Sequence, residues 1–215
     1  MKYIYLTSFG DCVDHLMSVH NPRTFIHMFV PEKFDSDFQE LVQKFLPITN
    51  QYLDIPNTHC DVFDMSKINN QYDCLIMHGT KNRFQLIDNI NKFKLLPFIK
   101  SIPVYVGICG GASILQKKII EVRSYDKDKH IINGLNLLNN NSFYYFHYSH
   151  RVINYPDYMK KINLISSDHP DMNIYLLDDI NTFIYFDNIN NKIEYDGDIV
   201  KIRNAHRADL NKGNF

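Results

Sequence analysis

The chain has 215 residues, of which 45% are hydrophobic and 22% are charged, and its formal net charge at pH 7 is −1. This composition is typical of a globular protein with a sizeable core, and the nearly neutral charge gives no electrostatic basis for binding nucleic acid or an anionic membrane. The four cysteines are widely spaced and form no Cys-x-x-Cys pair. We therefore expect reduced thiols rather than a disulfide framework.

The first residues do not resemble a secretion signal. Residues 1–6 lack a long apolar core and a small-residue cleavage site, and no apolar run in the chain reaches the length of a membrane span. We therefore expect a cytoplasmic protein that makes no membrane contact.

Strand-like and helix-like segments alternate along the first half of the chain. Strands are predicted at 3–7, 25–30, 72–77 and 104–108, and a helix at 84–98. A further helix is predicted to start at Ser36, which forms a capping-box pattern with Gln39, and to end before Pro47. This alternation indicates an α/β protein with a mainly parallel sheet covered by helices on both faces.

The second half of the chain is predicted to contain more closely spaced strands. They lie at 143–148, 161–166, 173–177, 182–186 and 200–206, and turns rich in Pro, Asp and Asn link them. Strands this close together favour antiparallel additions to the sheet in the C-terminal part. No linker, repeat or low-complexity segment divides the chain, so we expect residues 1–215 to form a single domain.

A cysteine flanked by glycines follows the predicted strand at 104–108. Gly107, Gly110 and Gly111 surround Cys109, and a short helical pattern begins directly afterwards. Small residues at these positions are typical of a nucleophile elbow, the sharp strand-to-helix turn that presents a reactive side chain next to backbone N–H groups. Such a turn stabilises both a thiolate and an oxyanion. The alternative is a buried structural cysteine beside a tight turn.

The segment Gly107-Ile108-Cys109-Gly110-Gly111 resembles the elbow of the class I glutamine amidotransferases, although Ser113 stands where that family has a glutamine. The resemblance implies a flavodoxin-like three-layer sandwich. It also implies that Cys109 hydrolyses a carboxamide, most simply glutamine to glutamate and ammonia, without a cofactor. Because the chain has no ligase domain of its own, the resemblance further implies a separate synthetase subunit that uses the ammonia.

The resemblance also implies where the oxyanion and the substrate are held. The family has an oxyanion loop after the strand that corresponds to 72–77, which places Gly79 in that role together with the amide of Gly110. Gly111 in the elbow and Ser149, in a segment that resembles the family's substrate-side strand and loop, are the further candidates. The alternative for the Gly79 loop is an ordinary strand-to-helix turn.

The general base is the least determined part of the predicted site. The family's histidine belongs to a His-Pro-Glu motif just after a late strand, and chain order places that strand at 182–186, where Asp187 then occupies the histidine position. His206, at the end of the strand pattern 200–206, is a later candidate. His169-Pro170-Asp171 imitates the motif but comes early and is predicted to form a turn.

Two further candidates for the base, His147 and His150, lie in the segment 146–150. Serine peptidases of related fold take their catalytic histidine from about this part of the chain. If the segment is a strand, His147 and Ser149 share one face and His150 lies on the other, so only one of these histidines can face the cysteine.

Other site chemistries receive little support from the sequence. His147 and His150 form an isolated pair without the other ligands of a zinc site, and no phosphate-binding or dinucleotide-binding glycine motif is present. The leading hypothesis is a glutaminase-type amide hydrolase that acts through Cys109. The alternatives are a pseudoenzyme or binding module that has lost its base, and a stand-alone cysteine hydrolase or peptidase that uses His147 or His150.

Overall fold

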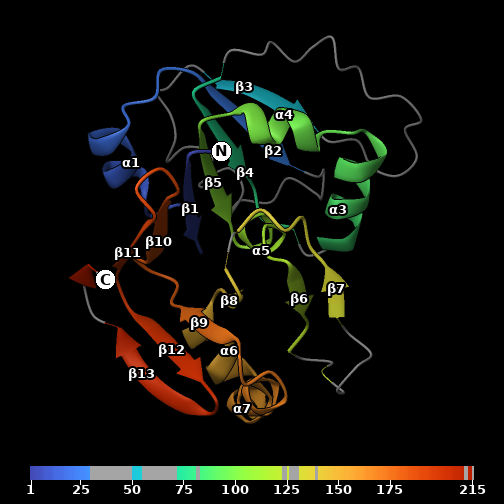
Figure 1. Cartoon of the computed structure of the whole chain (residues 1–215), viewed down its shortest axis with the longest axis vertical. Helices are drawn as coiled ribbons and strands as arrows, with labels where there is room; N and C mark the ends of the chain where they lie inside the picture. Colours follow the sequence, from blue (N-terminus) through green and yellow to red (C-terminus); the bar gives the residue numbers. More distant parts are fainter. Residues whose placement is uncertain are drawn as a thin grey trace.

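The computed structural model describes residues 1–29, 50–54, 72–80, 83–122, 125, 131–138, 140–210 and 213–214. Its largest sheet has eight strands in the order β14-β11-β10-β1-β5-β4-β2-β3 (Figure 1). Their bounds are β1 (Tyr3–Thr7), β2 (Phe25–Phe29), β3 (Asn50–Asp54), β4 (Cys74–Met77), β5 (Val104–Ile108), β10 (Phe183–Asp187), β11 (Lys192–Asp196) and β14 (Gly213–Asn214).

The direction of the strands divides this sheet into two parts. Strands β1, β5, β4, β2 and β3 are parallel to one another, whereas β10, β11 and β14 add in antiparallel fashion beside β1. The predicted fold class, an α/β protein with a mainly parallel sheet and antiparallel additions from the C-terminal part, is confirmed.

Helices cover both faces of the parallel strands. On one face, α1 (Val13–Val19) packs against alternate residues such as Tyr5, Ile76 and Val106. On the other, α3 (Arg83–Lys92), α4 (Leu96–Ser101) and α5 (Gly110–Ser113) pack near the residues in between, such as Leu6 and Leu75. Every residue of β4 and β5 is buried, as expected for parallel strands with two covered faces.

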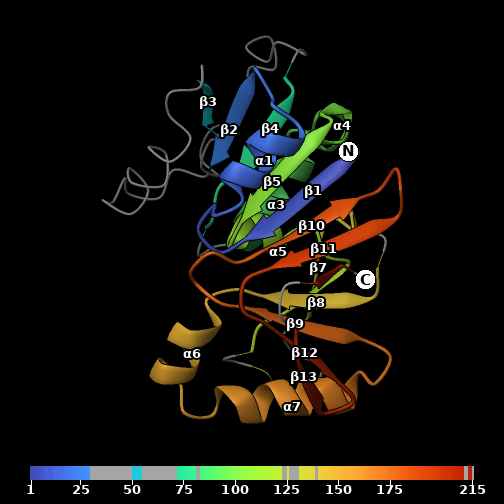
Figure 2. The same cartoon turned by 90° about the vertical axis from the view of Figure 1, so that its left-hand side faces the viewer.

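A second sheet of four strands lies beside the larger one (Figure 2). Its order is β13 (His206–Leu210), β12 (Ile199–Arg203), β9 (Asn173–Leu177) and β8 (Ser142–Tyr145). One face contributes Tyr144, Tyr175 and Leu177 to the core shared with the larger sheet, and α7 (Tyr158–Asp168) covers the other face. The remaining elements are the hairpin of β6 (Lys118–Ile120) and β7 (Ile131–Asn133), and the short helix α6 (Tyr148–Asn154).

The single helix predicted at 84–98 is wrong, because the structure has two helices there. The chain leaves α3 through Lys94, which has φ 54°, and enters α4 with a proline in its first turn. Proline has no N–H to donate, so Pro97 suits a helix start and not a helix interior. Both helices nonetheless bury their apolar residues as predicted, among them Leu86, Ile90 and Phe98.

Three strand predictions in the second half are corrected. Residues 161–166 lie in α7, where Tyr158, Ile162 and Ile165 are buried at spacings of four and three residues, which is a helical period. The strand predicted at 143–148 ends at Tyr145. The run 200–206 is a hairpin, since β12 ends before Asn204 and Ala205, whose φ values of 47° and 59° form the tight turn into β13.

Some predicted elements cannot be compared with the structure. The helix that starts at Ser36, and Val30 at the end of the second predicted strand, lie outside the described residues. In the part of the chain that is described, no helix has the length and apolar character needed to cross a bilayer.

Candidate active site

Cys109 occupies a strained turn at the end of the central strand β5. Its backbone angles are φ 48° and ψ −105°, a positive φ that is uncommon for a residue with a side chain and often marks a functional site. The turn is held on both sides, because the Cys109 N–H donates to the Thr7 carbonyl at 2.9 Å and the Ser113 N–H donates to the Cys109 carbonyl at 2.9 Å. This is the geometry of a nucleophile elbow.

The glycines around the elbow are required because other backbone atoms lie where their side chains would be. A Cβ added at Gly110 would lie 2.5 Å from the Thr80 carbonyl oxygen, and one at Gly111 would lie 2.2 Å from that of Met77. Gly79 borders the nucleophile itself, since a Cβ there would lie 3.2 Å from Cys109 Cβ and 3.7 Å from Gly110 N. The loop after β4 and the start of α5 therefore meet beside the thiol, where an oxyanion hole would form.

His147 is the histidine that the structure brings to the thiol. Hydrogen bonding and charge from this side chain act on the Cys109 thiol and lower its pKa against the effect of burial. The His147 Nδ1 lies 2.6 Å from Asp179 Oδ1, which leaves Nε2 for the sulfur. Cys109, His147 and Asp179 thus follow one another in the order that a nucleophile, a base and an orienting acid take in a catalytic triad.

A left-handed backbone conformation places the His147 ring. His147 has φ 62° and ψ 44° and caps α6, with its carbonyl accepting from the Arg151 N–H at 2.9 Å. Its N–H donates to Ser8 Oγ at 3.4 Å, and the Phe9 ring packs edge-on at 4.8 Å between centroids. Because α6 begins at once, the strand alternation predicted for His147, Ser149 and His150 does not apply.

Asp179 is the third residue of this arrangement, and it was not among the residues predicted from the sequence. Asp178 and Asp179 are the first two residues after β9. Asp178 stabilises this loop through hydrogen bonds to both of its carboxylate oxygens. Asp178 Oδ1 accepts from the Asp179 N–H at 2.7 Å, and Oδ2 accepts from Ser149 Oγ at 2.5 Å. The Asp178 carbonyl also accepts from Ser8 Oγ at 2.8 Å. The only signal in the sequence is a pair of aspartates at the end of a predicted strand, a pattern that is also typical of an ordinary turn.

The electrostatic environment favours an ionised thiol. Burial alone would raise the pKa of Cys109, but the hydrogen bond and charge of His147, together with the positive charges of Arg151 and Arg83, outweigh burial and lower it. Burial likewise acts to lower the pKa of His147, yet its interactions with Cys109 and Asp179 raise it. Both shifts stabilise a thiolate–imidazolium pair.

The two arginines near the thiol come from different helices. Arg83 begins α3 and forms an ion pair with Glu121, just after β6. Arg151 lies in α6 and donates from Nε to the Phe146 carbonyl at 2.7 Å. Burial lowers the pKa of the Arg83 guanidinium, although the Cys109 thiol opposes that shift. The positive charges of both arginines therefore act on the nucleophile.

The other predicted site residues lie elsewhere. His150 is exposed on α6, and Ser149 contacts Asp178 rather than the thiol. His206 is exposed and lies at the turn between β12 and β13. The opposite end of β12 is the one close to Asp178, whose N–H donates to the Asp198 carbonyl at 3.2 Å. His169 ends α7 and packs its ring against Phe143.

The predicted position of Asp187 in place of a catalytic histidine is wrong. Strand β10 is antiparallel to β1, with Phe183 opposite Thr7 and Asp187 opposite Tyr3. Since Cys109 lies at the Thr7 end of the sheet, Asp187 is at the far edge. There its carboxylate accepts hydrogen bonds from the turn at Ile189 and Asn190.

Among the described residues, no group of three or more His, Cys, Asp or Glu side chains is placed to hold a metal ion.

Comparison with known proteins gives a match at the level of fold. No protein-family model and no curated protein sequence matches the chain. The crystal structure of a "Putative Peptidase E Protein" from Listeria monocytogenes EGD-e is similar, with a TM-score of 0.56 and 17% sequence identity over 99% of this chain and 100% of that one. This chain thus has the overall fold of that protein.

Proposed function

We propose that this protein is a cysteine-dependent hydrolase of amide bonds, with Cys109 as the nucleophile, His147 as the general acid and base, and Asp179 as the group that orients His147. The observation that carries the proposal is the continuous chain of contacts from the thiol through the imidazole to the carboxylate, with 2.6 Å between His147 Nδ1 and Asp179 Oδ1. Because a base is present beside the thiol, the triad argues against a pseudoenzyme that has lost its base.

The proposed reaction has two stages. The Cys109 thiolate attacks the amide carbonyl carbon, and the backbone N–H groups of Gly110 and Gly79 stabilise the negative oxygen. Imidazolium Nε2–H of His147 then gives its proton to the departing amine as the C–N bond breaks, leaving a thioester on Cys109. In the second stage His147 takes a proton from water, the resulting hydroxide attacks the thioester, and the acid leaves as the thiolate re-forms.

We further propose that the substrate is a peptide-type amide and that the chain acts without a synthetase subunit. The base comes from the start of α6, whereas the amidotransferase resemblance had implied a histidine after a late strand. The name of the Listeria protein, a peptidase, agrees with this choice. Glutamine hydrolysis is the competing reaction, and it is measured beside peptide hydrolysis in the test.

The test is a comparison of hydrolysis by the wild-type chain and three variants. Dipeptides and short peptides are incubated with the protein, new amino groups are quantified with an amine-reactive dye, and ammonia release from glutamine is followed in parallel. Cys109→Ala and His147→Gln should abolish peptide hydrolysis, whereas His150→Gln, an exposed substitution of the same kind on the same helix, should retain it. Hydrolysis that persists in Cys109→Ala would overturn the proposal, and hydrolysis of glutamine alone would restore the glutaminase hypothesis.

A further inference from the structure

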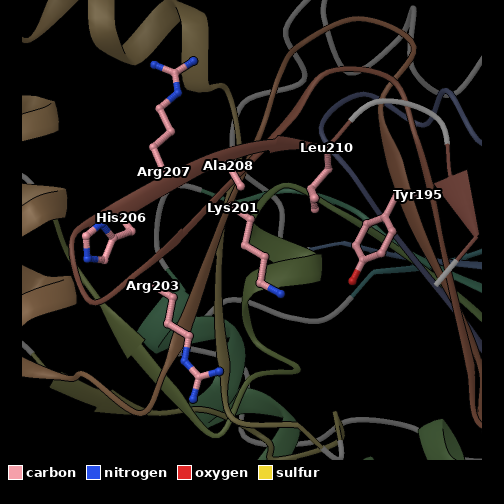
Figure 3. A pocket seen from close by; sticks show the side chains of 7 residues that line it. All are labelled: Tyr195, Lys201, Arg203, His206, Arg207, Ala208 and Leu210. Carbon is pink, nitrogen blue, oxygen red and sulfur yellow. The ribbon is translucent and has the colours of Figure 1, made fainter.

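A pocket lies between the larger sheet and the hairpin of β12 and β13 (Figure 3). Its volume is about 440 Å³, within the roughly 300–1,000 Å³ usual for small-molecule sites. Its lining residues are Tyr195 of β11, Lys201 and Arg203 of β12, and His206, Arg207, Ala208 and Leu210 of β13. The size and the mixture of cationic and apolar walls suit a small ligand.

The register of the hairpin explains which side chains face the pocket. Lys201 lies directly opposite Ala208, and Arg203 lies opposite His206, so these four residues share one face of the hairpin. Arg207 is opposite the buried Ile202, on the other face. Figure 3 agrees, since the Arg207 side chain points away from those of Lys201 and Arg203.

The pocket face carries positive charge without an acidic partner. No Asp or Glu lines it, and neither Lys201 nor Arg203 forms an ion pair with any residue that the structure describes. Successive side chains of a strand point to opposite faces, so the acidic residues on either side of Tyr195 lie on the other face of β11. There Glu194 contacts Lys192 and His15. Two neighbouring cations without a counter-ion favour the binding of an anion.

An aromatic wall adjoins these cations. The Tyr195 ring stacks on Tyr175 at 5.8 Å between centroids with planes 19° apart, and the Lys201 ammonium lies 5.6 Å from the centre of the Tyr175 ring. The small Ala208 opposite Lys201 leaves room above the hairpin. One part of the pocket is therefore apolar and flat, and another is cationic.

We propose that this pocket binds a small organic anion. Its phosphate or carboxylate group would lie between Lys201 and Arg203, and its flat or apolar body against Tyr195, Ala208 and Leu210. This ligand is distinct from the amide substrate, because none of Cys109, His147 and Asp179 lines the pocket.

Isothermal titration of the full chain tests the proposal with four probes. AMP supplies a phosphate on a flat body and 4-hydroxybenzoate a carboxylate on one, whereas inorganic phosphate lacks the body and adenosine lacks the charge. We expect AMP or 4-hydroxybenzoate to bind at least tenfold more tightly than phosphate and adenosine, and more weakly as salt is raised. Which of the two binds more tightly distinguishes an organic phosphate from an organic carboxylate.

Variants connect the binding to the pocket. Lys201→Gln combined with Arg203→Gln should weaken binding at least tenfold, and Ala208→Leu should weaken it by filling the space while keeping both charges. Lys160→Gln, at an exposed lysine of α7, is the control and should bind as the wild type does. Unchanged melting temperatures show that the variants are folded. Binding of adenosine as tight as that of AMP, the absence of binding by both organic anions, or wild-type affinity in the double variant would overturn the proposal.

Discussion

The imidazole Nδ1 of His147 and the carboxylate Oδ1 of Asp179 lie 2.6 Å apart, although the two residues are 32 positions apart in the sequence. The parallel pairing of β8 and β9 explains this contact. Tyr145 pairs with Leu176, and the chain reaches His147 two residues after Tyr145 and Asp179 three residues after Leu176. Because the carboxyl ends of parallel strands lie at the same edge of a sheet, both residues reach the edge that faces the elbow.

The first prediction concerns the orienting role of Asp179. Asp179→Asn keeps the size of the side chain but removes the charge that stabilises a protonated His147. We expect kcat for peptide hydrolysis to fall by about 10²- to 10⁴-fold, as is typical when the acid of a triad is neutralised. Steady-state kinetics measures this change. Asp171→Asn, at an exposed position, is the matched control, and equal kcat in the two variants would contradict the orienting role.

The second prediction concerns the ionisation of Cys109. Only the thiolate is alkylated by iodoacetamide, so the rate rises with pH through the thiol pKa. Because the pKa of Cys109 is lowered mainly by His147 against the effect of burial, the midpoint should lie below the ordinary value of about 8.5. In His147→Gln the hydrogen bond and the charge are lost, so the midpoint should move to higher pH.

Controls for this experiment come from the same chain. Mass spectrometry of digested protein separates Cys109 from Cys12 and Cys74, both of which are fully buried and have a raised pKa because of that burial. These two thiols should label slowly in the folded protein. His150→Gln should leave the Cys109 midpoint unchanged. A midpoint that is the same in the wild type and His147→Gln would show that the imidazole does not act on the thiol.

The third prediction separates folding from chemistry at two glycines. A Cβ at Gly111 would lie 2.2 Å from the Met77 carbonyl oxygen, so Gly111→Ala should lower the free energy of unfolding by about 1–3 kcal/mol or more, the usual cost of overpacking. At Gly79 the nearest atom would be Cys109 Cβ at 3.2 Å, which a small shift relieves. Gly79→Ala should therefore fold but hydrolyse peptides more slowly.

Urea unfolding and kinetics on the two glycine variants together check this prediction. The expected pattern is a loss of stability in Gly111→Ala and a loss of kcat at nearly wild-type stability in Gly79→Ala. A Gly79→Ala variant that is as active as the wild type would show that the loop after β4 does not contact the reacting carbonyl.

The elbow and the strands next to it could be predicted because their signals are local. The apolar run of β5 and the glycines around Cys109 report a strand and a tight turn within one short segment. The triad acid could not be identified in this way. Whether Asp178 or Asp179 faces a histidine depends on the pairing of β8 with β9 and on the bracing of the loop by Ser8 and Ser149, which join distant parts of the chain.

The misplaced base has a similar cause. From the order along the chain, the strand before Asp187 was predicted to end beside Cys109. That prediction is correct only if the strand runs parallel to its neighbour. Strand β10 instead runs antiparallel to β1, and its amino end, at Phe183, lies at the active edge. Nothing in the local pattern of residues 182–186 distinguishes the two directions, since each gives a buried strand of the same length.

The last prediction tests the helix that replaces the predicted strand at 161–166. On a strand, Ile162 and Leu164 would share a face and be equally buried. In α7 their directions differ by more than half a turn, so Ile162 is fully buried and Leu164 is 42% exposed. Ile162→Ala should therefore lower the free energy of unfolding by about 2–5 kcal/mol, and Leu164→Ala by much less. Urea unfolding measures both variants, and equal losses would support the strand instead.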